Sequence, residues 1–413
     1  MRILRLRAYY YPESVAASHL SDDMDEEYQR HGISQLIYTP MPSRGVSKEQ
    51  RKEYKRKKRE FLNDGYIEVY RFNMFGETSN PISRMIRYML CNVAEYKKGI
   101  RANNIDLVHS GSTPPTQGLL SGLVAQKLSK KYGRKVPFVY NLQDIFPDSL
   151  VNAGMAKKGG LLWKIGRRIE DATYNKADKI IVISEGFKRN IMAKGVPEEK
   201  IVIISNWVDL DAVKPVEREV NTLFDEFDID RTKFIVMYAG NLGEAQGADV
   251  IIEAAKDLIS NSDIQFVIFG GGARYQEIKA EAEKISNIFI TGLQPQERVS
   301  EVYSMGNVAL ITCKTGTGNA GMPSKTWSIM ACNTPIIASF DTESDLADIV
   351  RDSGAGCCVE PGNPEALSDA IKASYEDWKQ GKRNTADIRG YAIKTASKEV
   401  CVQKYVDTLQ SVT

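Results

Sequence analysis

The chain lacks most of the features that mark secreted, membrane-spanning or zinc-binding proteins. Its six cysteines form no CxxC pair and show no zinc-ligand spacing, so buried, reduced thiols are expected. No apolar run approaches the roughly 20 residues of a membrane span, and Met1 is followed at once by a strand-like pattern. The net charge is only +2, which gives no general case for nucleic-acid binding. We therefore expect a cytoplasmic protein.

The patterns of metal-dependent and dinucleotide-dependent enzymes are missing as well. No DxD pair stands in a plausible loop, and the nearest match, Asp341-Thr342-Glu343, is more typical of a sugar contact or a helix cap. Gly270-Gly271-Gly272 follows an apolar run but lacks complete GxGxxG spacing, which favours a tight turn near a ligand over a dinucleotide site. We expect neither a metal nor a cofactor.

Short apolar runs alternate with amphipathic helical patterns along most of the chain. Most runs are continuous, as in parallel strands that are covered on both faces. The expected strands are 2–8, 33–39, 67–72, 105–109, 136–142, 179–183 and 201–204 in a first series, and 234–239, 264–269, 287–291, 308–312, 335–339 and 356–360 in a second. Helical patterns include 119–133, 250–260 and 365–378. This alternation predicts an α/β fold with parallel sheets and right-handed crossovers.

The two series are separated by residues 205–233, where the apolar periodicity lapses and Pro215 interrupts the chain. We place the boundary near Trp207. The predicted domains are a Rossmann-like domain at 1–207, a second one at 208–390, and a C-terminal helix at 391–413 that can pack back on the first domain. Ligands of open α/β sheets bind outside the carboxyl ends of the strands, so we expect the function in a cleft that both domains face.

Residues 234–258 combine an apolar strand, a glycine turn and an amphipathic helix, which is a suitable place for phosphate. Gly240 and Gly243 let the backbone approach an anion, and the N–H groups of a helix start carry partial positive charge. The side chains of the turn supply no cation, since they include Asn241, Glu244 and Gln246. The turn therefore predicts a phosphate site whose positive charge comes from elsewhere.

A second helix start can provide that charge. Residues 318–339 read as a glycine-rich loop, a helix beginning at Pro323 and a strand. Lys325 stands in the first helical turn, where a cation opposes the helix dipole unless an anion binds there. The alternative is a lysine that extends to solvent from a surface helix. Arg274 and Lys314, which follow other strands, can add positive charge or can be solvated surface cations.

Several segments together resemble glycosyltransferase family 4, whose members are retaining enzymes with the GT-B fold. They are YAGNLGEAQG at 238–247, FGGG at 269–272, NIFITGLQP at 287–295, MPSKTWSIMACNTPIIAS at 322–339, GAGCCVEPGNPEAL at 354–367 and the hinge SNWVD at 205–209. The resemblance implies two Rossmann-like domains facing a cleft, with a nucleotide-sugar donor, most often a UDP-sugar, bound by the second domain and an acceptor by the first. Members with a similar Pro-Ser-Lys helix and Gln-Asp-x-x-Pro loop often build bacterial surface polysaccharides, capsule or exopolysaccharide, which implies a glycan or a polyprenyl-diphosphate-linked acceptor.

The chain departs from the family at the positions that usually carry charge. Asn241 and Gln246 stand where the family has an Arg and a Lys, and the paired glutamates fall near Ser328 and Ala320. The resemblance then leaves Lys325, with Lys314 or Arg274, to neutralise the donor diphosphate. The expected donor-binding residues are Gly240, Asn241, Gly243, Gln246, Gly271, Arg274, Lys314, Asn319, Pro323, Ser324, Lys325 and Ser328.

Three residues are candidates for a catalytic role. Asp144 follows a strand and can contact the acceptor or the sugar, although a loop hydrogen-bond acceptor or N-cap fits equally well. Glu13, after Pro12, is a second carboxylate of this kind, and Lys325 would stabilise the leaving diphosphate without a metal. His109 is more typical of a structural histidine at a strand end.

Two segments predict contact with a membrane surface. The basic run within 48–61 can form a solvated helix or can bind anionic lipid headgroups or a lipid-diphosphate acceptor. In 80–98, apolar side chains share one helical face with two arginines at its rim. These are Ile82, Met85, Ile86, Met89 and Leu90, with Arg84 and Arg87. We therefore expect peripheral attachment to the inner face of the cell membrane.

Two other classes of protein remain open. A sugar-nucleotide epimerase or hydrolase can use the same two-domain architecture, and a non-catalytic sugar-nucleotide-binding protein would bind the diphosphate without turnover.

Overall fold

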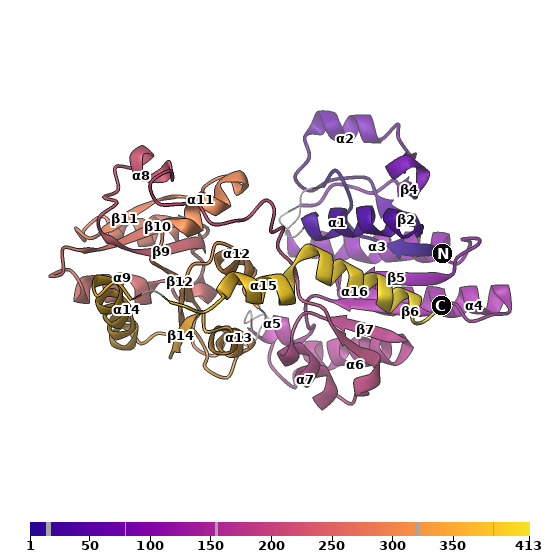
Figure 1. The fold of residues 1–413 in the computed structure, drawn as a ribbon. Coiled ribbons are helices and arrows are strands. Elements are labelled where there is room, and N and C mark those ends of the chain that lie inside the picture. Colours follow the sequence, from indigo (N-terminus) through magenta and orange to yellow (C-terminus); the bar gives the residue numbers. More distant parts are fainter. Residues whose placement is uncertain (14–17, 79, 153–155, 319–321, 383) are drawn as a thin grey trace. The chain divides into compact units, whose positions relative to one another are not determined.

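A computed structural model describes residues 1–413 apart from 14–17, 79, 153–155, 319–321 and 383 (Figure 1). The chain divides into two compact units. Unit 1 comprises Met1–Ser205 with Cys401–Thr413, and unit 2 comprises Asn206–Val400. The boundary predicted near Trp207 lies within two residues of this division. The segment that returns to unit 1 begins at Cys401 and not at 391, because helix α15 (Ile388–Ala396) packs on α12 (Lys325–Ala331) of unit 2.

Unit 1 is built on an eight-stranded sheet. In spatial order its strands are β3 (Arg59–Leu62), β4 (Ile67–Phe72), β2 (Ser34–Pro40), β1 (Arg2–Leu6), β5 (Leu107–Gly111), β6 (Phe138–Leu142), β7 (Lys179–Val182) and β8 (Ile201–Ile203). All neighbours pair in parallel except β3 and β4. The strand order reverses between β1 and β5, which makes that edge of the sheet a switch point for ligand binding.

Helices cover both faces of this sheet. The helices of this unit are α1 (Ser18–Arg30), α2 (Lys48–Tyr54), α3 (Pro81–Gly99), α4 (Gln117–Tyr132), α5 (Asp148–Asn152), α6 (Leu161–Lys176), α7 (Glu185–Ala193) and α16 (Lys398–Gln410). On one face α3 packs on α4, and α4 packs on α6, over a core that includes Leu4, Leu6 and Phe138. On the other face the His109 ring of β5 contacts Tyr28 of α1 and Tyr405 of α16.

Strand β3 is the one strand of the described chain that the sequence did not predict. It lies at the end of the basic run and pairs antiparallel with β4. Charge pairs between the strands hold it there, since Arg59 Nη2 is 2.6 Å from Glu68 Oε1 and Arg71 Nε is 2.8 Å from Glu60 Oε2. Opposite charges across a strand pair stabilise the pairing, and the helix predicted over this run therefore stops at Tyr54.

Unit 2 contains a six-stranded, fully parallel sheet. Its strands in spatial order are β11 (Ile288–Gly292), β10 (Ile264–Gly271), β9 (Phe234–Asn241), β12 (Val308–Thr312), β13 (Ile336–Ser339) and β14 (Gly356–Val359). Its other helices are α8 (Leu223–Glu226), α9 (Asp249–Asp257), α10 (Tyr275–Ala282), α11 (Val299–Ser304), α13 (Asp345–Ser353) and α14 (Pro364–Lys379). Side chains of β9 alternate between two apolar cores, one on each face of the sheet. The switch point lies between β9 and β12.

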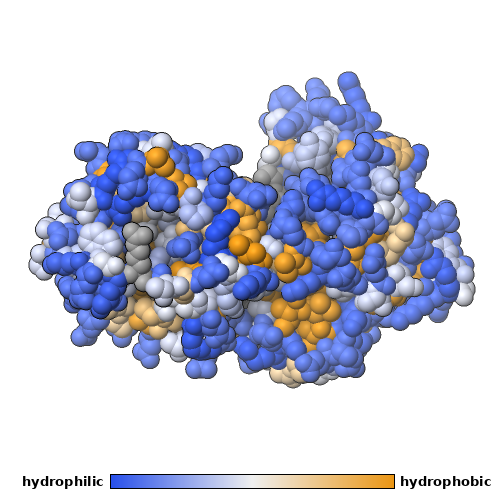
Figure 2. All heavy atoms as spheres, viewed as in Figure 1, coloured by the Kyte–Doolittle hydropathy of each residue, from blue (hydrophilic) through white to orange (hydrophobic). Residues whose placement is uncertain are grey.

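The predicted α/β architecture with two parallel-rich sheets is thus confirmed. Each of the thirteen predicted strands corresponds to an observed one. Strands such as β9 and β12 are apolar runs that are buried on both faces of the sheet. Within the described ranges, no helix combines the length and the apolar character needed to cross a bilayer. Figure 2 shows one face of the molecule, on which hydrophilic residues predominate and apolar residues form separate groups.

Candidate functional site

The glycine turn at the carboxyl end of β9 does not open directly onto a helix, although the sequence predicted that it would. A short 3₁₀ turn, Glu244–Gln246, follows the strand, and α9 begins only at Asp249. Gly240 and Gly247 have φ angles of 147° and 55°, a region that favours glycine. Asp249 already places an acidic side chain in the first turn of α9, so this helix start is not an unoccupied site for an anion.

Hydrogen bonds tie this turn to the carboxyl end of β12. The Thr312 hydroxyl donates to the Gln246 carbonyl at 2.7 Å, and the Lys314 N–H donates to the Ala245 carbonyl at 2.8 Å. A Cβ at Gly247 would lie 3.0 Å from the Cys313 carbonyl oxygen, so the two segments approach as closely as glycine allows. The turn is therefore fixed at the switch point of unit 2, where ligands of such sheets bind.

The neutral side chains of the turn bind each other. Asn241 Nδ2 donates to Gln246 Oε1 at 3.0 Å, and the Gly243 N–H donates to the same oxygen at 3.2 Å. A Cβ at Gly243 would lie 2.9 Å from both amides. The Gln246 amide thus closes the turn, and a side chain at position 243 would displace the Asn241 and Gln246 amides.

Lys325 is the first residue of α12 and lies beside this turn. The helix begins there and not at Pro323, so Pro323 and Ser324 precede it. The Lys325 Nζ donates to the Ala239 carbonyl at 3.1 Å and lies 3.9 Å from the centre of the Tyr238 ring. No carboxylate lies within 4 Å of it in the part of the chain that the structure describes. Burial lowers the pKa of Lys325 to about 7.

The ammonium of Lys325 therefore adjoins the glycine end of β9. A Cβ added to Gly240 would lie 3.1 Å from its Nζ, so the lysine and this glycine share one small space. Tyr238 completes the arrangement, because its ring faces the ammonium and its hydroxyl donates to the Asn241 carbonyl at 2.7 Å. Sequence reasoning missed Tyr238, since nothing in an apolar strand shows which side chain meets a lysine 87 residues later.

The two other predicted cations, Arg274 and Lys314, have different surroundings. Arg274 is engaged by carboxylates: it forms two hydrogen bonds of 2.7 Å with Asp249, pairs with Glu277 and lies 3.3 Å from Glu244. The positive charge that we expected Arg274 to offer a diphosphate is therefore balanced by acidic side chains in this structure. Lys314 is exposed and has no ion pair within the described ranges. Of the remaining predicted donor residues, Gly271 accepts the Leu242 N–H through its carbonyl at 2.6 Å.

Asp341 positions the loop that precedes α12. Its Oδ1 accepts the Gly316 N–H at 3.0 Å and its Oδ2 accepts the Gly318 N–H at 2.7 Å. The alternative that Asp341 caps a helix is incorrect, because Ser344 caps α13 by accepting the Ala347 N–H. Ser328 follows Lys325 by three residues on α12, whereas Asn319 and Ala320 lie outside the described residues.

In unit 1, Glu13 is buried and committed to backbone contacts. Its Oε1 accepts the N–H groups of Ser43 and Arg44 at 2.8 and 3.0 Å, and its Oε2 accepts the Tyr10 N–H at 3.3 Å. Burial raises the pKa of Glu13, while these backbone hydrogen bonds oppose the increase. The geometry gives Glu13 a role in joining two loops, and not the direct substrate contact that the sequence suggested.

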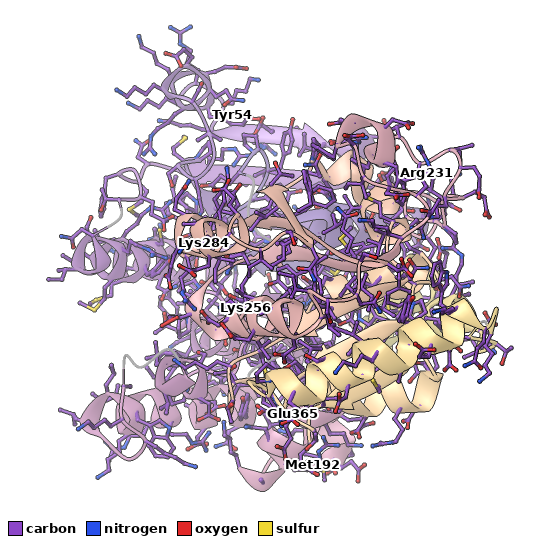
Figure 3. The ribbon with its side chains drawn as sticks, turned by 90° about the vertical axis from the view of Figure 1, so that its left-hand side faces the viewer. Tyr54, Met192, Arg231, Lys256, Lys284 and Glu365 are labelled. Atoms are coloured by element: carbon purple, nitrogen blue, oxygen red, sulfur yellow. The ribbon has the colours of Figure 1, made fainter. Side chains whose placement is uncertain are left out.

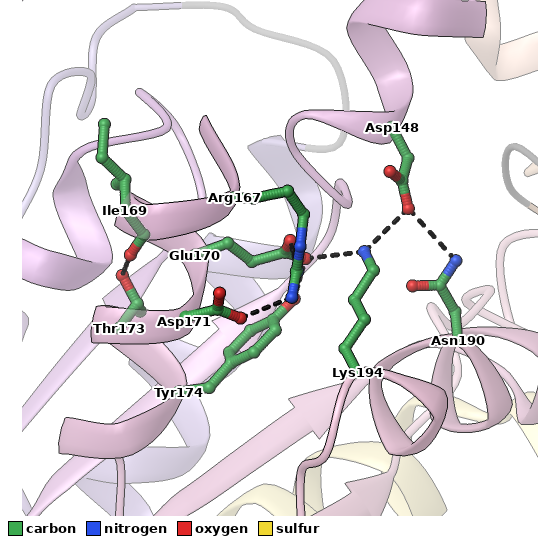
Figure 4. A network of polar contacts seen from close by, with 9 residues as sticks. All are labelled: Asp148, Arg167, Ile169, Glu170, Asp171, Thr173, Tyr174, Asn190 and Lys194. Carbon is green, nitrogen blue, oxygen red and sulfur yellow. Dashed lines mark hydrogen bonds and ion pairs between the residues drawn. The ribbon is translucent and has the colours of Figure 1, made fainter. Parts of the chain in front are cut away.

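Asp144 follows the carboxyl end of β6 and is exposed. Partial desolvation by the surrounding protein raises the pKa of Asp144, and a hydrogen bond with Ser149 opposes this increase. The loop is anchored further along, where Asp148 accepts hydrogen bonds from Lys194 Nζ at 2.7 Å and Asn190 Nδ2 at 3.3 Å (Figure 4). Lys194 also pairs with Glu170 at 3.0 Å, so α5, α6 and α7 together fix the segment that carries Asp144.

His109 is buried, and neither ring nitrogen has a hydrogen-bond partner among the described residues. Burial, together with the charges of Arg5 and Arg7, keeps its pKa well below the ordinary value. A neutral histidine packed between two tyrosines agrees with the structural role that we expected.

Two family models match the chain, one chiefly over each unit. "Glycosyltransferase Family 4" matches residues 22–212, and "Glycosyl transferases group 1" matches residues 219–392. Among curated proteins, the probable glycosyltransferase WbjE of Pseudomonas aeruginosa is 29% identical over 273 residues, 66% of each chain. The putative colanic acid biosynthesis glycosyl transferase WcaI of Escherichia coli K12 is 28% identical over 278 residues, 66% of this chain and 67% of that protein. The aligned part spans about two thirds of these relatives.

Solved structures share the fold over the full chain. Sucrose-phosphate synthase from Thermosynechococcus elongatus superimposes with a TM-score of 0.74 at 16% identity, covering 100% of this chain and 98% of the other. HepE of Anabaena in complex with UDP gives a TM-score of 0.72 at 15% identity and covers 100% of both chains. With two parallel-rich sheets, the two family matches and these neighbours, the chain belongs to the GT-B glycosyltransferases of the family 4 type.

Proposed function

We propose that the protein transfers a sugar from a nucleotide-diphosphate donor, a UDP-sugar, to a glycan or lipid-linked acceptor during synthesis of a bacterial surface polysaccharide. The name of WcaI refers to colanic acid biosynthesis, and HepE was solved with UDP, which supports this class of substrate. The observation that carries the proposal is the Lys325 ammonium beside Gly240, which has a carbonyl and an aromatic ring as neighbours but no counter-ion in the described part of the chain.

A diphosphate at this point would supply the missing negative charge. The local dielectric is low, so an ammonium–phosphate contact there is stronger than one at an exposed surface. Asn241 and Gln246 hold the turn without adding charge, and Arg274 is occupied by acidic residues. Lys314 can approach the same anion from the end of β12. In this proposal Lys325 takes the place of the arginine and lysine that the family resemblance implies at positions 241 and 246.

For the transfer step, Lys325 stabilises the charge that develops on the leaving diphosphate. Retention requires that the acceptor hydroxyl attack the same face of the sugar that the diphosphate leaves, so the acceptor must be positioned accurately. Asp144, on an anchored loop at the carboxyl edge of the sheet of unit 1, is our candidate for orienting that hydroxyl.

Donor binding should depend on pH through Lys325. Its pKa is depressed to about 7 in the free protein, and an anion binds the protonated form more tightly. The affinity for UDP-glucose should therefore be highest below pH 7 and should fall as pH rises above it, by up to about tenfold per unit. UDP-glucose is the appropriate ligand for calorimetry. The terminal phosphate of UDP itself titrates at about pH 6, which would add its own pH dependence to the measurement. A Lys325→Met variant should show a flat profile over the same range, and an equal decline in both proteins would contradict the assignment.

Transfer should not require a divalent metal. Charge on the leaving group is met by Lys325, so we expect turnover in excess EDTA to match turnover without it. The protein is mixed with a UDP-sugar and a membrane extract, and the amount of UDP released is measured with and without the chelator. Loss of turnover in EDTA and its recovery with Mn²⁺ or Mg²⁺ would overturn this part of the proposal.

The donor class can be tested without knowing the acceptor. A ligand that binds the folded state raises the unfolding temperature, so UDP and UDP-sugars should stabilise the protein more than GDP or ADP and their sugars. Incubation with a UDP-sugar and no acceptor distinguishes a transferase from the alternatives, since a hydrolase or epimerase would convert the sugar nucleotide alone.

We also propose that α3 attaches the protein to an anionic membrane surface. This helix has reversed polarity: the charged residues Arg87 and Glu95 are completely buried, whereas most of its exposed side chains are apolar. The exposed apolar residues are Ile82, Met85, Ile86, Met89, Leu90 and Val93, each between 46% and 65% exposed. Such a face with nearby basic residues fits the headgroup boundary of an anionic bilayer.

The basic helix α2 supports the same partner. In Figure 3, α2 is marked by Tyr54 and stands at the margin of unit 1 with its long side chains directed outward. Lys48, Lys52, Lys55 and Arg56 on or just after this helix are exposed. An apolar helix face and a separate cationic helix in one unit provide the two forces that hold peripheral proteins on anionic lipid.

A further inference from the structure

Unit 1 contains a pocket of about 570 Å³ at the carboxyl ends of β2 and β4. Its walls come from residues that follow these two strands and from the chain just after α2. They are Met41, Asn73, Met74, Phe75, Lys55 and Lys58. The volume lies within the range of small-molecule sites, roughly 300–1,000 Å³. The carboxyl edge of a parallel sheet is also where such sites form.

The lining combines positive charge with an apolar wall. Lys55 and Lys58 are exposed and have no ion pair among the described residues, although Lys57, between them in sequence, pairs with Glu53. No acidic side chain lines the pocket. The remaining wall is Asn73, a phenylalanine and two methionines, and methionines adapt well to flexible apolar ligands. The complementary ligand carries negative charge at one end and hydrocarbon at the other.

The pocket walls are held in place by two guanidinium groups behind them. Arg51 donates to the Met74 carbonyl at 2.7 Å and to the Pro42 carbonyl at 3.1 Å, so it joins the segments that follow β4 and β2. Arg87 donates to the Phe75 carbonyl at 3.2 Å. Arg87 is fully buried, and its Nη1 has no hydrogen-bond partner in the described chain. These contacts fix the wall before any ligand arrives, which lowers the entropic cost of binding.

Phe75 gives the pocket an apolar exit. Its side chain is 42% exposed, and its carbonyl is held by Arg87 from the buried side of α3. A hydrocarbon chain bound in the pocket can therefore leave past the Phe75 ring.

We propose that this pocket binds the phosphate or diphosphate ester of a long hydrocarbon chain, with Lys55 and Lys58 on the phosphate and Met41, Met74 and Phe75 on the first apolar segment. The inference rests on the proposed function and deepens it, because it assigns the lipid-phosphate part of a lipid-linked acceptor to a site in unit 1. The donor site in unit 2 shares no residue with it.

Titration calorimetry with three soluble probes tests the proposal on the full-length protein. Farnesyl diphosphate, below its micelle concentration, should bind at least about tenfold more tightly than either inorganic diphosphate or farnesol, because only it meets both parts of the lining. Equal affinity for inorganic diphosphate would overturn the lipid assignment. Equal affinity for farnesol would overturn the phosphate assignment, and no binding of farnesyl diphosphate would overturn the site.

A matched pair of variants locates the binding. Lys55→Ala/Lys58→Ala should weaken farnesyl diphosphate about tenfold or more, whereas Lys48→Ala/Lys52→Ala, which removes the same charge from exposed positions of the same basic run, should change it less than about twofold. Equal losses would mean that the basic run attracts anions generally, and the pocket would be rejected. Phe75→Ser should weaken farnesyl diphosphate but not inorganic diphosphate.

Donor binding and lipid binding are measured separately, so the failure of one proposal can be distinguished from the failure of the other. Lys55→Ala/Lys58→Ala should leave the thermal shift by UDP unchanged, and Lys325→Met should leave farnesyl diphosphate affinity unchanged. Absence of any UDP shift alongside tight farnesyl diphosphate binding would contradict the donor assignment alone. The reverse result would contradict the pocket alone.

Discussion

Lys325→Met should reduce the affinity for a UDP-sugar and kcat/KM on the order of a hundredfold, because it removes about 3 kcal/mol of ammonium–phosphate interaction in a partly buried site. Methionine keeps most of the lysine volume and removes the charge. The loss should exceed that of Lys314→Ala, since Lys314 is exposed and solvent screens its charge.

The same substitution should not destabilise the free protein. Burial of the Lys325 ammonium lowers its pKa to about 7, so its charged form is unfavourable in the absence of an anion. We therefore expect Lys325→Met to unfold at the same or a higher temperature than the wild type, measured without ligand. A protein that loses both stability and UDP binding would show that Lys325 serves the fold, and the donor role would be rejected.

Met85→Glu/Met89→Glu should abolish binding to vesicles that contain anionic lipid, with a loss on the order of a hundredfold in partition coefficient. The change replaces two exposed apolar contacts with negative charges on the outward face of α3. Flotation at low salt measures it. Because both side chains are more than half exposed, the unfolding temperature should change little.

A control with the same chemistry elsewhere tests whether the effect is local. Val220→Glu/Ile259→Glu places two glutamates at exposed apolar positions of unit 2 and should leave flotation unchanged. If the α3 variant floats like the wild type, this helix does not contact lipid. If the wild type sediments as a dimer that the α3 variant converts to monomer, the apolar face binds a second copy and the membrane proposal is wrong.

The extent to which sequence predicted the fold depended on the kind of interaction that forms each element. Strands such as β9 and β12 are continuous apolar runs, and burial on both faces leaves them few alternatives. Strand β3 was missed because it has only four residues, two of them charged, and because its stability depends on pairing with Glu68 and Arg71 of a neighbouring strand. Contacts of that kind depend on the folded sheet and leave no periodicity in the sequence.

The same distinction applies to the candidate site. Gly240 and Lys325 could be identified because backbone conformation and helix position make local demands that sequence displays. The ion pair of Arg274 could not be foreseen, because its partner, Asp249, is 25 residues away and only the fold brings them together. The contacts of Glu13 were hidden for a similar reason, since the backbone groups that bind its carboxylate belong to a loop 30 residues later.

The central claim, that Lys325 meets the donor diphosphate, can be tested on the ammonium itself. In protein labelled at lysine, the NMR signal that Lys325→Met removes reports the protonation of Lys325. Its midpoint should lie near pH 7 in the free protein, well below an ordinary lysine, and should rise when UDP-glucose binds. A midpoint that UDP-glucose leaves unchanged, at a concentration that saturates the protein, would contradict the account.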